Sequence, residues 1–291
     1  MLSDSLCKTT RSADPNLFSP LGISAPSPRL TVGRYFSLLG GNFKQALVQP
    51  FHMQKKDWKY LSVTALLAGG LSFGDEPVQR FALRLRTENQ GLQKASGFVT
   101  NFGDRYELYT LGAFGAYSFL FKKERMQTTT LLASQAFVTS SVLVSALKFL
   151  TVRTRPSYYQ QLQEAEPYFL GPFVGKAGYN GDRTNTSFPS GHTASVFAVA
   201  TVFAKEYRDR RWVPALAYGA ATLVGLSRIT ENKHWATDVF AGAALGYVTG
   251  LQAVNSYHRR FPAKAAHLAR HLNFNLQYSR GSLVPGLIYK I

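Results

Sequence analysis

His234 and Asp238 are four residues apart and stand beside a long apolar run, residues 239–254. If a helix begins near His234, the two side chains share one face. A carboxylate that binds one imidazole nitrogen leaves the other nitrogen free to act as a nucleophile or a base. Arg228 lies just upstream on the connecting segment, and its guanidinium can bind phosphate oxygens as a planar fork. Taken alone, this spacing is more often a surface or capping pair.

A second polar stretch closes an earlier apolar run. Lys148 and Arg155 are seven residues apart, about two helical turns, so both can project to the same side of a helix. Pro156 discourages the helix from continuing and would place Arg155 at its exit. A basic helix end that complements the helix dipole would contain the same residues. The stretch therefore indicates chemistry only if it lies near His234.

A third polar stretch, Pro189-Ser190-Gly191-His192, is typical of a turn that leads into a helix. The N–H groups at a helix N-terminus bind phosphate oxygens, and a glycine there allows close approach. A plain N-cap by Ser190 is the alternative explanation. All three stretches lie at the edges of apolar segments, so separate helices can bring them together.

Together these stretches supply two histidines, three long cations, one carboxylate and one helix N-terminus. Cations and N–H groups stabilise the charge of a phosphoryl group in transfer. One histidine could attack phosphorus while the other protonates the leaving oxygen. Cys7 is the only cysteine and the stretches hold no carboxylate-rich group, so we expect no metal and no other cofactor. The residue types predict a metal-independent phosphomonoesterase.

The composition favours an anionic partner. Of the 291 residues, 45% are hydrophobic and 17% are charged, and 33 Lys+Arg against 16 Asp+Glu give a net charge of +17. Such a charge suits nucleic acid, or an anionic membrane surface and phosphorylated substrates. The basic residues lie between apolar runs and no nucleic-acid-binding module is visible. We therefore expect a membrane and a phosphorylated substrate as partners, and no nucleic acid. The sequence indicates no oligomeric state.

The apolar runs predict an all-α core of six helices. They cover residues 61–73, 108–121, 128–150, about 190–204, 212–226 and 239–254. The last two runs contain several glycines, which permit close helix packing in lipid or in a protein core. These glycines are Gly219, Gly225, Gly242, Gly246 and Gly250.

Three parts are expected along the chain. Residues 1–59 would be a mobile N-terminal tail and membrane approach, residues 60–256 a phosphatase domain, and residues 257–291 a basic tail whose alternation is typical of short strands. Two acids and a proline from Asp75 onward predict a helix start. The apolar spacing that follows fits a helix on a membrane surface and an ordinary surface helix equally well.

Loop charge predicts how the helices would sit in a membrane. The basic junctions at residues 122–125, 205–211 and 257–260 fall on one side if all six runs span, and the positive-inside rule makes that side cytoplasmic. The three polar stretches then fall on the opposite side. Several runs are shorter than the ~20 residues of a bilayer crossing, and the mean hydropathy is −0.10. A soluble protein with buried helices is the alternative.

The three stretches resemble the three signature motifs of the type 2 phosphatidic acid phosphatase (PAP2) superfamily, in order and at every defining position. The matching residues are Lys148-x6-Arg155-Pro156, Pro189-Ser190-Gly191-His192 and Ser227-Arg228-x5-His234-x3-Asp238. The resemblance covers about residues 60–255. That superfamily also includes bacterial class A acid phosphatases, lipid phosphate phosphatases, undecaprenyl-pyrophosphate phosphatases and vanadium haloperoxidases.

The resemblance implies that His234 is a nucleophile that forms a phosphohistidine, that Asp238 orients it, and that His192 is the general acid. The phosphate-binding residues would be Lys148, Arg155, Ser190, Gly191 and Arg228. It also implies a haloperoxidase-like bundle of six core, transmembrane helices in a bacterial cell envelope, with the site facing the periplasm or exterior. The expected function is metal-independent hydrolysis of a lipid phosphate or pyrophosphate.

Three alternative functions are a soluble or peripheral acid phosphatase of broad specificity, a vanadate-dependent haloperoxidase and a catalytically idle membrane protein. Haloperoxidase relatives are usually longer, and an idle protein would not need every motif residue. Aromatic side chains crowd the segment between the first two motifs, where they would form an apolar opening for a lipid tail or simply pack the loop. They are Tyr158, Tyr159, Tyr168, Phe169, Phe173 and Tyr179.

Overall fold

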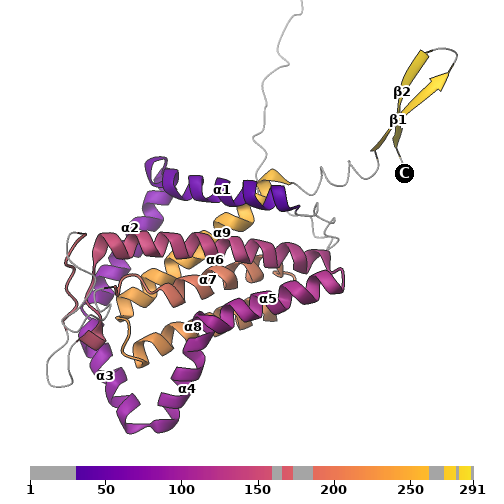
Figure 1. Ribbon diagram of the computed structural model, residues 1–291. Helices are drawn as coiled ribbons and strands as arrows, with labels where there is room; N and C mark the ends of the chain where they lie inside the picture. Colours follow the sequence, from indigo (N-terminus) through magenta and orange to yellow (C-terminus); the bar gives the residue numbers. More distant parts are fainter. Residues whose placement is uncertain (1–30, 159–165, 173–185, 262–271, 280–281, 290–291) are drawn as a thin grey trace, which may run out of the picture.

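Figure 1 shows a computed structural model of the chain, in which long helices pack side by side into a bundle. The structure describes residues 31–158, 166–172, 186–261, 272–279 and 282–289. Within these residues it has nine α-helices and one β-hairpin, besides three short 3-10 helices. The elements are α1 (Val32–Val48), η1 (Gln49–Phe51), α2 (Lys55–Ser72), α3 (Asp75–Glu88), α4 (Gln90–Thr100), η2 (Asn101–Gly103), α5 (Arg105–Leu120), α6 (Glu124–Thr151), η3 (Pro156–Tyr158), α7 (Gly191–Glu206), α8 (Trp212–Thr230), α9 (Ala236–Arg260), β1 (Leu272–Ser279) and β2 (Ser282–Tyr289).

The predicted helical fold class is confirmed. The six apolar runs lie in α2 and in α5 to α9, and α3 begins at Asp75, where the acidic start predicts it. The number of helices in the described residues is nine rather than six, because α1, α3 and α4 add to the six runs. The expected strands are present as well: β1 and β2 pair antiparallel, with Leu272 opposite Tyr289. Most of the predicted mobile tail lies outside the described residues.

α1 lies where the sequence analysis predicts a tail and membrane approach instead of a helix. Two adjacent glycines in its middle lower its helix propensity. Tertiary contacts compensate, because Leu38 is buried in the core and Asn42 Nδ2 donates a hydrogen bond to Gln135 Oε1 on α6 at 3.0 Å. Contacts with distant residues therefore help to stabilise this helix.

α7 is the central helix and packs against α6, α8 and α9. α9 runs beside it with glycines at the contact: a Cβ at Gly242 would lie 2.5 Å from Ser190 O, and Cβ atoms at Gly246 and Gly250 would collide with carbonyl oxygens one and two turns further along α7. The predicted close packing through glycine is confirmed for these three residues. Gly219 on α8 has open space at its Cβ position instead.

Three basic junctions meet at one end of the bundle. Arg125, at the start of α6, donates to Glu206 O at the end of α7 and to Asp209 beyond it, with an Nη1–Oδ2 distance of 3.0 Å. His258, near the end of α9, lies 2.7 Å from Glu206 Oε1. The expected grouping of the basic junctions on one side is therefore confirmed.

Large apolar side chains cover the outside of α2, α5 and α8. No residue of α2 is buried, and Leu66, Leu120 and Leu216 are 75%, 77% and 63% exposed. Of the helices in the described residues, α6 is long and apolar enough to cross a membrane, with a mean hydropathy of 1.5 over its best window, 44% of which is buried. A core helix of a soluble protein meets the same criterion, so the six predicted spans stay a prediction.

Candidate active site

Helix ends bring the three polar stretches together at the end of the bundle opposite Arg125. Lys148 lies in the last turn of α6, His192 in the first turn of α7, and Arg228 in the last turns of α8. His234 precedes the first residue of α9 by two positions. Lys148, Arg155 and Arg228 lie close enough for their positive charges to act on both His192 and His234. The convergence expected from the sequence is thus present.

Two local details differ from the sequence prediction. α6 ends at Thr151, so Lys148 and Arg155 do not share one continuous helix. The chain leaves α6 through Val152, whose φ of 42° and ψ of 58° are left-handed, because Arg153 turns into the interior there. Arg228 lies on α8 rather than on a connecting segment, because α8 continues to Thr230.

The cations at this end are held without carboxylate partners. Arg228 Nη1 donates to Thr100 Oγ1 at 2.5 Å, and Arg155 Nη2 donates to Thr186 Oγ1 at 3.2 Å. Among the described residues, neither arginine nor Lys148 forms an ion pair, and both arginine Nε atoms are buried without a hydrogen bond. Their positive charge is therefore available to an anion.

The turn into α7 supplies a helix N-terminus beside these cations. Ser190 caps the helix: its Oγ lies 2.8 Å from Thr193 Oγ1 and accepts a 3.5 Å hydrogen bond from Thr193 N. A Cβ on Gly191 would lie 3.8 Å from Lys148 Nζ, so the missing side chain leaves space where the ammonium approaches the backbone. The structure shows the capping role of Ser190, and its hydroxyl remains a predicted phosphate contact.

His192 is half-buried and packs against the segment that leads into α5. A Cβ on Gly103 would lie 2.8 Å from both His192 Cβ and Val224 Cγ1, so only glycine allows η2 to lie so close. This contact places η2, and with it the start of α5, directly beside the histidine.

His234 is 2% exposed, and its Nδ1 makes no hydrogen bond. Burial, reinforced by the positive charges of Arg155, Lys148 and Arg228, holds the pKa of His234 well below its usual value of 6.5. The imidazole is therefore neutral near neutral pH, which is the form that can attack phosphorus.

Asp238 connects the polar stretches to one another. Its Oδ2 accepts hydrogen bonds from Ser187 Oγ at 2.5 Å and from Trp235 N at 2.9 Å, and its backbone O accepts one from Ser190 N at 3.0 Å. The distance from Oδ2 to His234 Nδ1 is 3.6 Å, longer than a hydrogen bond. Catalytic hydrogen bonds are often long before substrate binds, so the orienting role of Asp238 stays a prediction.

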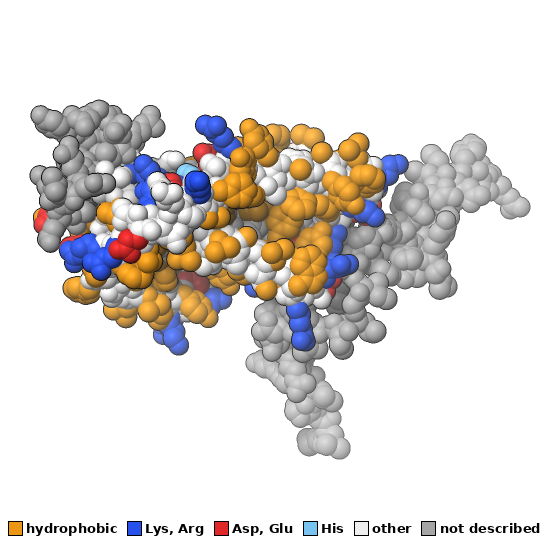
Figure 2. Space-filling model, turned by 90° about the horizontal axis from the view of Figure 1, so that it is seen from below, with side chains coloured by type: hydrophobic (Ala, Val, Ile, Leu, Met, Phe, Trp, Pro, Cys, Tyr) orange, Lys and Arg blue, Asp and Glu red, His pale blue; other side chains and the backbone are white. Residues whose placement is uncertain are grey.

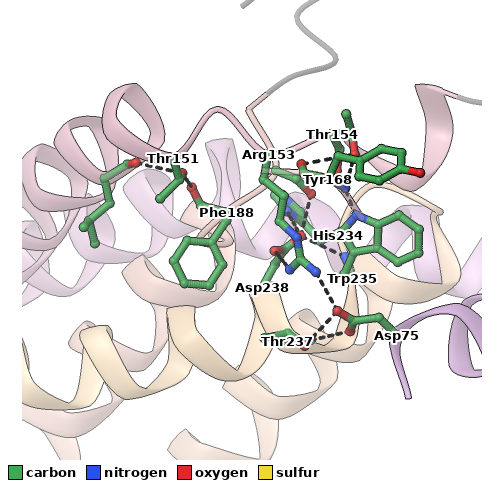
Figure 3. Close-up of polar contacts among 12 residues, drawn as sticks. Asp75, Thr151, Arg153, Thr154, Tyr168, Phe188, His234, Trp235, Thr237 and Asp238 are labelled. Carbon is green, nitrogen blue, oxygen red and sulfur yellow. Dashed lines mark hydrogen bonds and ion pairs between the residues drawn. The ribbon is translucent and has the colours of Figure 1, made fainter. Parts of the chain in front are cut away.

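Sequence reasoning missed a buried ion-pair chain behind Asp238. Figure 3 shows Arg153 between Asp75 and Asp238, with His234 and Trp235 beside it. The one sequence signal for Arg153 is its position two residues before Arg155, within the first motif. Asp75 was predicted only as a helix start, and its partner is far away in the sequence.

Part of the predicted aromatic opening lies outside the described residues, namely Tyr159, Phe173 and Tyr179. Tyr168 and Phe169 are more than half exposed. The guanidinium carbon of Arg153 lies 4.7 Å from the centre of the Phe169 ring. Phe169 therefore has a packing role, and a role in admitting a lipid tail stays a prediction.

Comparison with known proteins places this site in a family. Residues 128–262 match the model of the PAP2 superfamily. The chain is 51% identical over 65 residues to the lipid A 1-phosphatase of Porphyromonas gingivalis, which covers 22% of this chain and 15% of that protein. It thus matches much less than two thirds of that relative's length.

Two further relatives match over longer stretches. The undecaprenyl-diphosphatase of Sulfolobus acidocaldarius is 28% identical over 186 residues, 64% of this chain and 81% of that protein. The crystal structure of a transmembrane PAP2 type phosphatidylglycerolphosphate phosphatase from Bacillus subtilis is 20% identical, with a TM-score of 0.48 over 68% of this chain and 94% of that one. The matched residues contain all three motifs, most of α6 and all of α7 and α8, so this part of the chain is similar to the PAP2 superfamily.

Proposed function

We propose that the protein is a metal-independent phosphatase that hydrolyses a lipid phosphate or pyrophosphate, with residues 60–256 as its catalytic domain. The observation that carries this proposal is a group of three cations, which form no ion pair among the described residues, beside two histidines. Such a group stabilises a dianionic phosphate and the charge that develops on it in transfer. The relatives named as phosphatases of lipid A and of undecaprenyl diphosphate support the same reaction class.

In the first step, His234 Nε2 attacks phosphorus while Lys148, Arg155 and Arg228 hold the non-bridging oxygens. The N–P bond forms as the bond from phosphorus to the leaving oxygen breaks, and His192, which takes up a proton when the phosphate dianion binds, gives that proton to the leaving oxygen. Asp238 accepts the Nδ1 proton of His234 in a hydrogen bond, which keeps the Nε2 lone pair directed at phosphorus. The products are the lipid alcohol and a phosphohistidine.

In the second step, water attacks the phosphohistidine. His192 is now the base and takes a proton from the water as the new O–P bond forms and the N–P bond breaks. Inorganic phosphate leaves and His234 returns to its neutral form. Gly191 N–H and, after rotation away from Thr193, the Ser190 hydroxyl would add donors to the phosphate.

An apolar groove beside His192 supports a lipid substrate. The groove has a volume of about 760 Å³, and its walls come from α5, α7 and α8. Val224, Phe102 and Val196 line it, and Val224 is also the residue that packs with His192 around Gly103. Figure 2 views the bundle from the side of α4, α5 and α8 and shows hydrophobic side chains gathered over this face. A hydrocarbon chain in this groove would have its phosphate next to the cations.

The surface supports an enzyme embedded in a membrane. The exposed apolar side chains of α2, α5 and α8 would contact lipid. The Arg125 end of the bundle carries the basic junctions and would face the cytoplasm. The catalytic end would then face the periplasm or exterior of a bacterial cell envelope.

Phosphate release by the detergent-purified protein in EDTA tests the proposal. Phosphatidic acid, an isoprenyl pyrophosphate, phosphatidylglycerol phosphate and p-nitrophenyl phosphate are offered side by side, with His234→Ala as the control. We expect a preference for one lipid and loss of turnover in the variant. Equal or faster hydrolysis of the soluble ester would show a broad-specificity acid phosphatase instead. Wild-type activity on none of the four would contradict the proposal.

A separate measurement tests the membrane assignment. We expect the expressed protein to stay in the membrane fraction after washing with high salt or with carbonate. Release by either treatment would show a peripheral or soluble protein.

A further inference from the structure

We propose that Asp75 and Arg153 are positioning residues of this site: a buried chain of ion pairs through them holds Asp238 so that one carboxylate oxygen faces His234. The inference rests on the function proposed above. Asp75 and Arg153 are not among the defining residues of the three motifs. Asp75 also lies outside the residues that match the family model, 128–262.

The chain of ion pairs is complete and buried. Arg153 Nη2 lies 2.7 Å from Asp75 Oδ2, and Arg153 Nη1 lies 2.6 Å from Asp238 Oδ1. All three side chains are at most 1% exposed. Burying charges is costly unless each is paired with good geometry, and here one guanidinium joins two carboxylates through separate nitrogens. Such an arrangement restricts all three groups to one orientation.

The ion pair with Arg153 gives the two carboxylate oxygens of Asp238 different partners. Oδ1 accepts from Arg153, so the carboxylate cannot rotate without breaking a buried ion pair. Oδ2 accepts from Ser187 Oγ and Trp235 N and is the oxygen that lies 3.6 Å from His234 Nδ1. Arg153 thus determines which oxygen faces the nucleophile.

Asp75 also holds the backbone between the two motif residues. Its Oδ1 accepts a 2.9 Å hydrogen bond from Thr237 N, and its Oδ2 accepts a 2.8 Å hydrogen bond from Thr237 Oγ1. Thr237 directly precedes Asp238 in the first turn of α9. Asp75 therefore positions Asp238 twice, through the guanidinium of Arg153 and through the neighbouring peptide.

The residues around Arg153 hold its side chain in the interior of the protein. Val152, a buried β-branched residue, adopts a left-handed conformation that such residues rarely accept, and this turn directs Arg153 inward. The guanidinium lies near the rings of Phe169, at 4.7 Å, and Trp235, at 5.8 Å. Both of its Nη atoms are paired with carboxylates, unlike those of Arg155, so Arg153 is a positioning residue and not a phosphate ligand.

Asp75→Asn tests the proposal, with Glu76→Gln as the matched control. Both variants remove one carboxylate from the same turn of α3, but the side chain of Glu76 is 41% exposed and lies 3.8 Å from Arg80, longer than a hydrogen bond. For Asp75→Asn we expect kcat to fall at least about tenfold, with little change in KM or in inhibition by vanadate, because the cations that bind phosphate are untouched. For Glu76→Gln we expect kcat within about twofold of wild type.

Three results would overturn the proposal: a kcat for Asp75→Asn equal to that of Glu76→Gln, a loss confined to KM, or an equal loss of vanadate binding. The last two would show a damaged phosphate site or a merely structural role. If Asp75→Asn does not fold, Arg153→Lys provides the same readout, since lysine keeps the charge but has one nitrogen in place of the two that join the carboxylates. The proposed function is tested separately: if the wild type turns over substrate and His234→Ala does not, that function holds even when the inference about Asp75 and Arg153 fails.

Discussion

Both ends of the helical bundle are rich in cations, but the cations have different partners at the two ends. At one end, Arg125 and His258 lie against carboxylates and are partly exposed. At the other end, three cations form no ion pair among the described residues, and the two arginines donate hydrogen bonds to threonines. These are Lys148, Arg155 and Arg228.

This difference indicates that the paired cations stabilise the fold, whereas the other cations are positioned to bind an anionic ligand. A cation removed from water without a partner costs free energy, and an anion bound at the catalytic end would offset that cost. Carboxylates do lie nearby, but Asp75 and Asp238 are both paired with Arg153. The ion pairs of Asp75 and Asp238 thus go to a buried arginine and not to Lys148, Arg155 or Arg228.

Replacing a lysine at either end of α6 gives the largest expected contrast. Lys148→Met should lower kcat/KM by about 100- to 1000-fold, because one donor to the transferring phosphoryl group is lost. Lys123→Met, at the exposed start of the same helix, should stay within about twofold of wild type. Steady-state kinetics on the preferred lipid measure both. Equal losses would show that the two ends do not differ in function.

Stability should depend on the glycines that join α7 to α9 beneath the catalytic end. Gly246→Ala places a methyl group against Ala194 O and should lower the free energy of unfolding by about 1–3 kcal/mol. Gly219→Ala adds the same atom in open space and should leave stability unchanged or slightly higher. Thermal unfolding in detergent compares the two variants. Similar melting temperatures would contradict the close contact between α7 and α9.

The depressed pKa of His234 predicts a smaller, pH-dependent effect. Below about pH 6.5 an unfolded chain protonates this imidazole while the folded protein keeps it neutral. The unfolded state then binds more protons, so this contribution to stability is complete above pH 6.5 and is lost as the pH falls below it. Melting curves from pH 8 to pH 5 should show a shallower decline for His234→Gln than for wild type.

The matched control for this pH effect is His258→Gln at the other end of the bundle, which leaves His234 in place. Its melting temperature should decline with falling pH as steeply as that of wild type. A wild-type slope in His234→Gln would contradict the buried neutral histidine.

The smallest expected effect is that of chelation. Phosphate release should be unchanged after dialysis against EDTA, because cations and N–H groups of the chain itself are proposed to hold the phosphate. The comparison is the dialysed protein with and without added Mg²⁺ or Zn²⁺. A collapse of activity that a metal restores would overturn the mechanism.

The sequence predicts most of the framework and the residues at its catalytic end. Apolar runs locate six helices, glycine spacing predicts the contact of α9 with α7, and residue types identify the two histidines and the cations. The features that the sequence does not predict are contacts between residues far apart in the chain. Asp75 has the appearance of an ordinary acidic helix start, yet its partner Arg153 is 78 residues away. The left-handed turn at Val152, which directs Arg153 into the interior, is likewise not visible in the local sequence.

The most direct test of the account is to look for the covalent intermediate. Radiolabelled lipid phosphate is mixed with the purified protein, the reaction is quenched in alkali within one turnover, and the labelled peptide is identified. The account predicts label on His234 in wild type and none in His234→Ala. Turnover without label on His234, or label that persists in the variant, would contradict the proposal that His234 is the nucleophile.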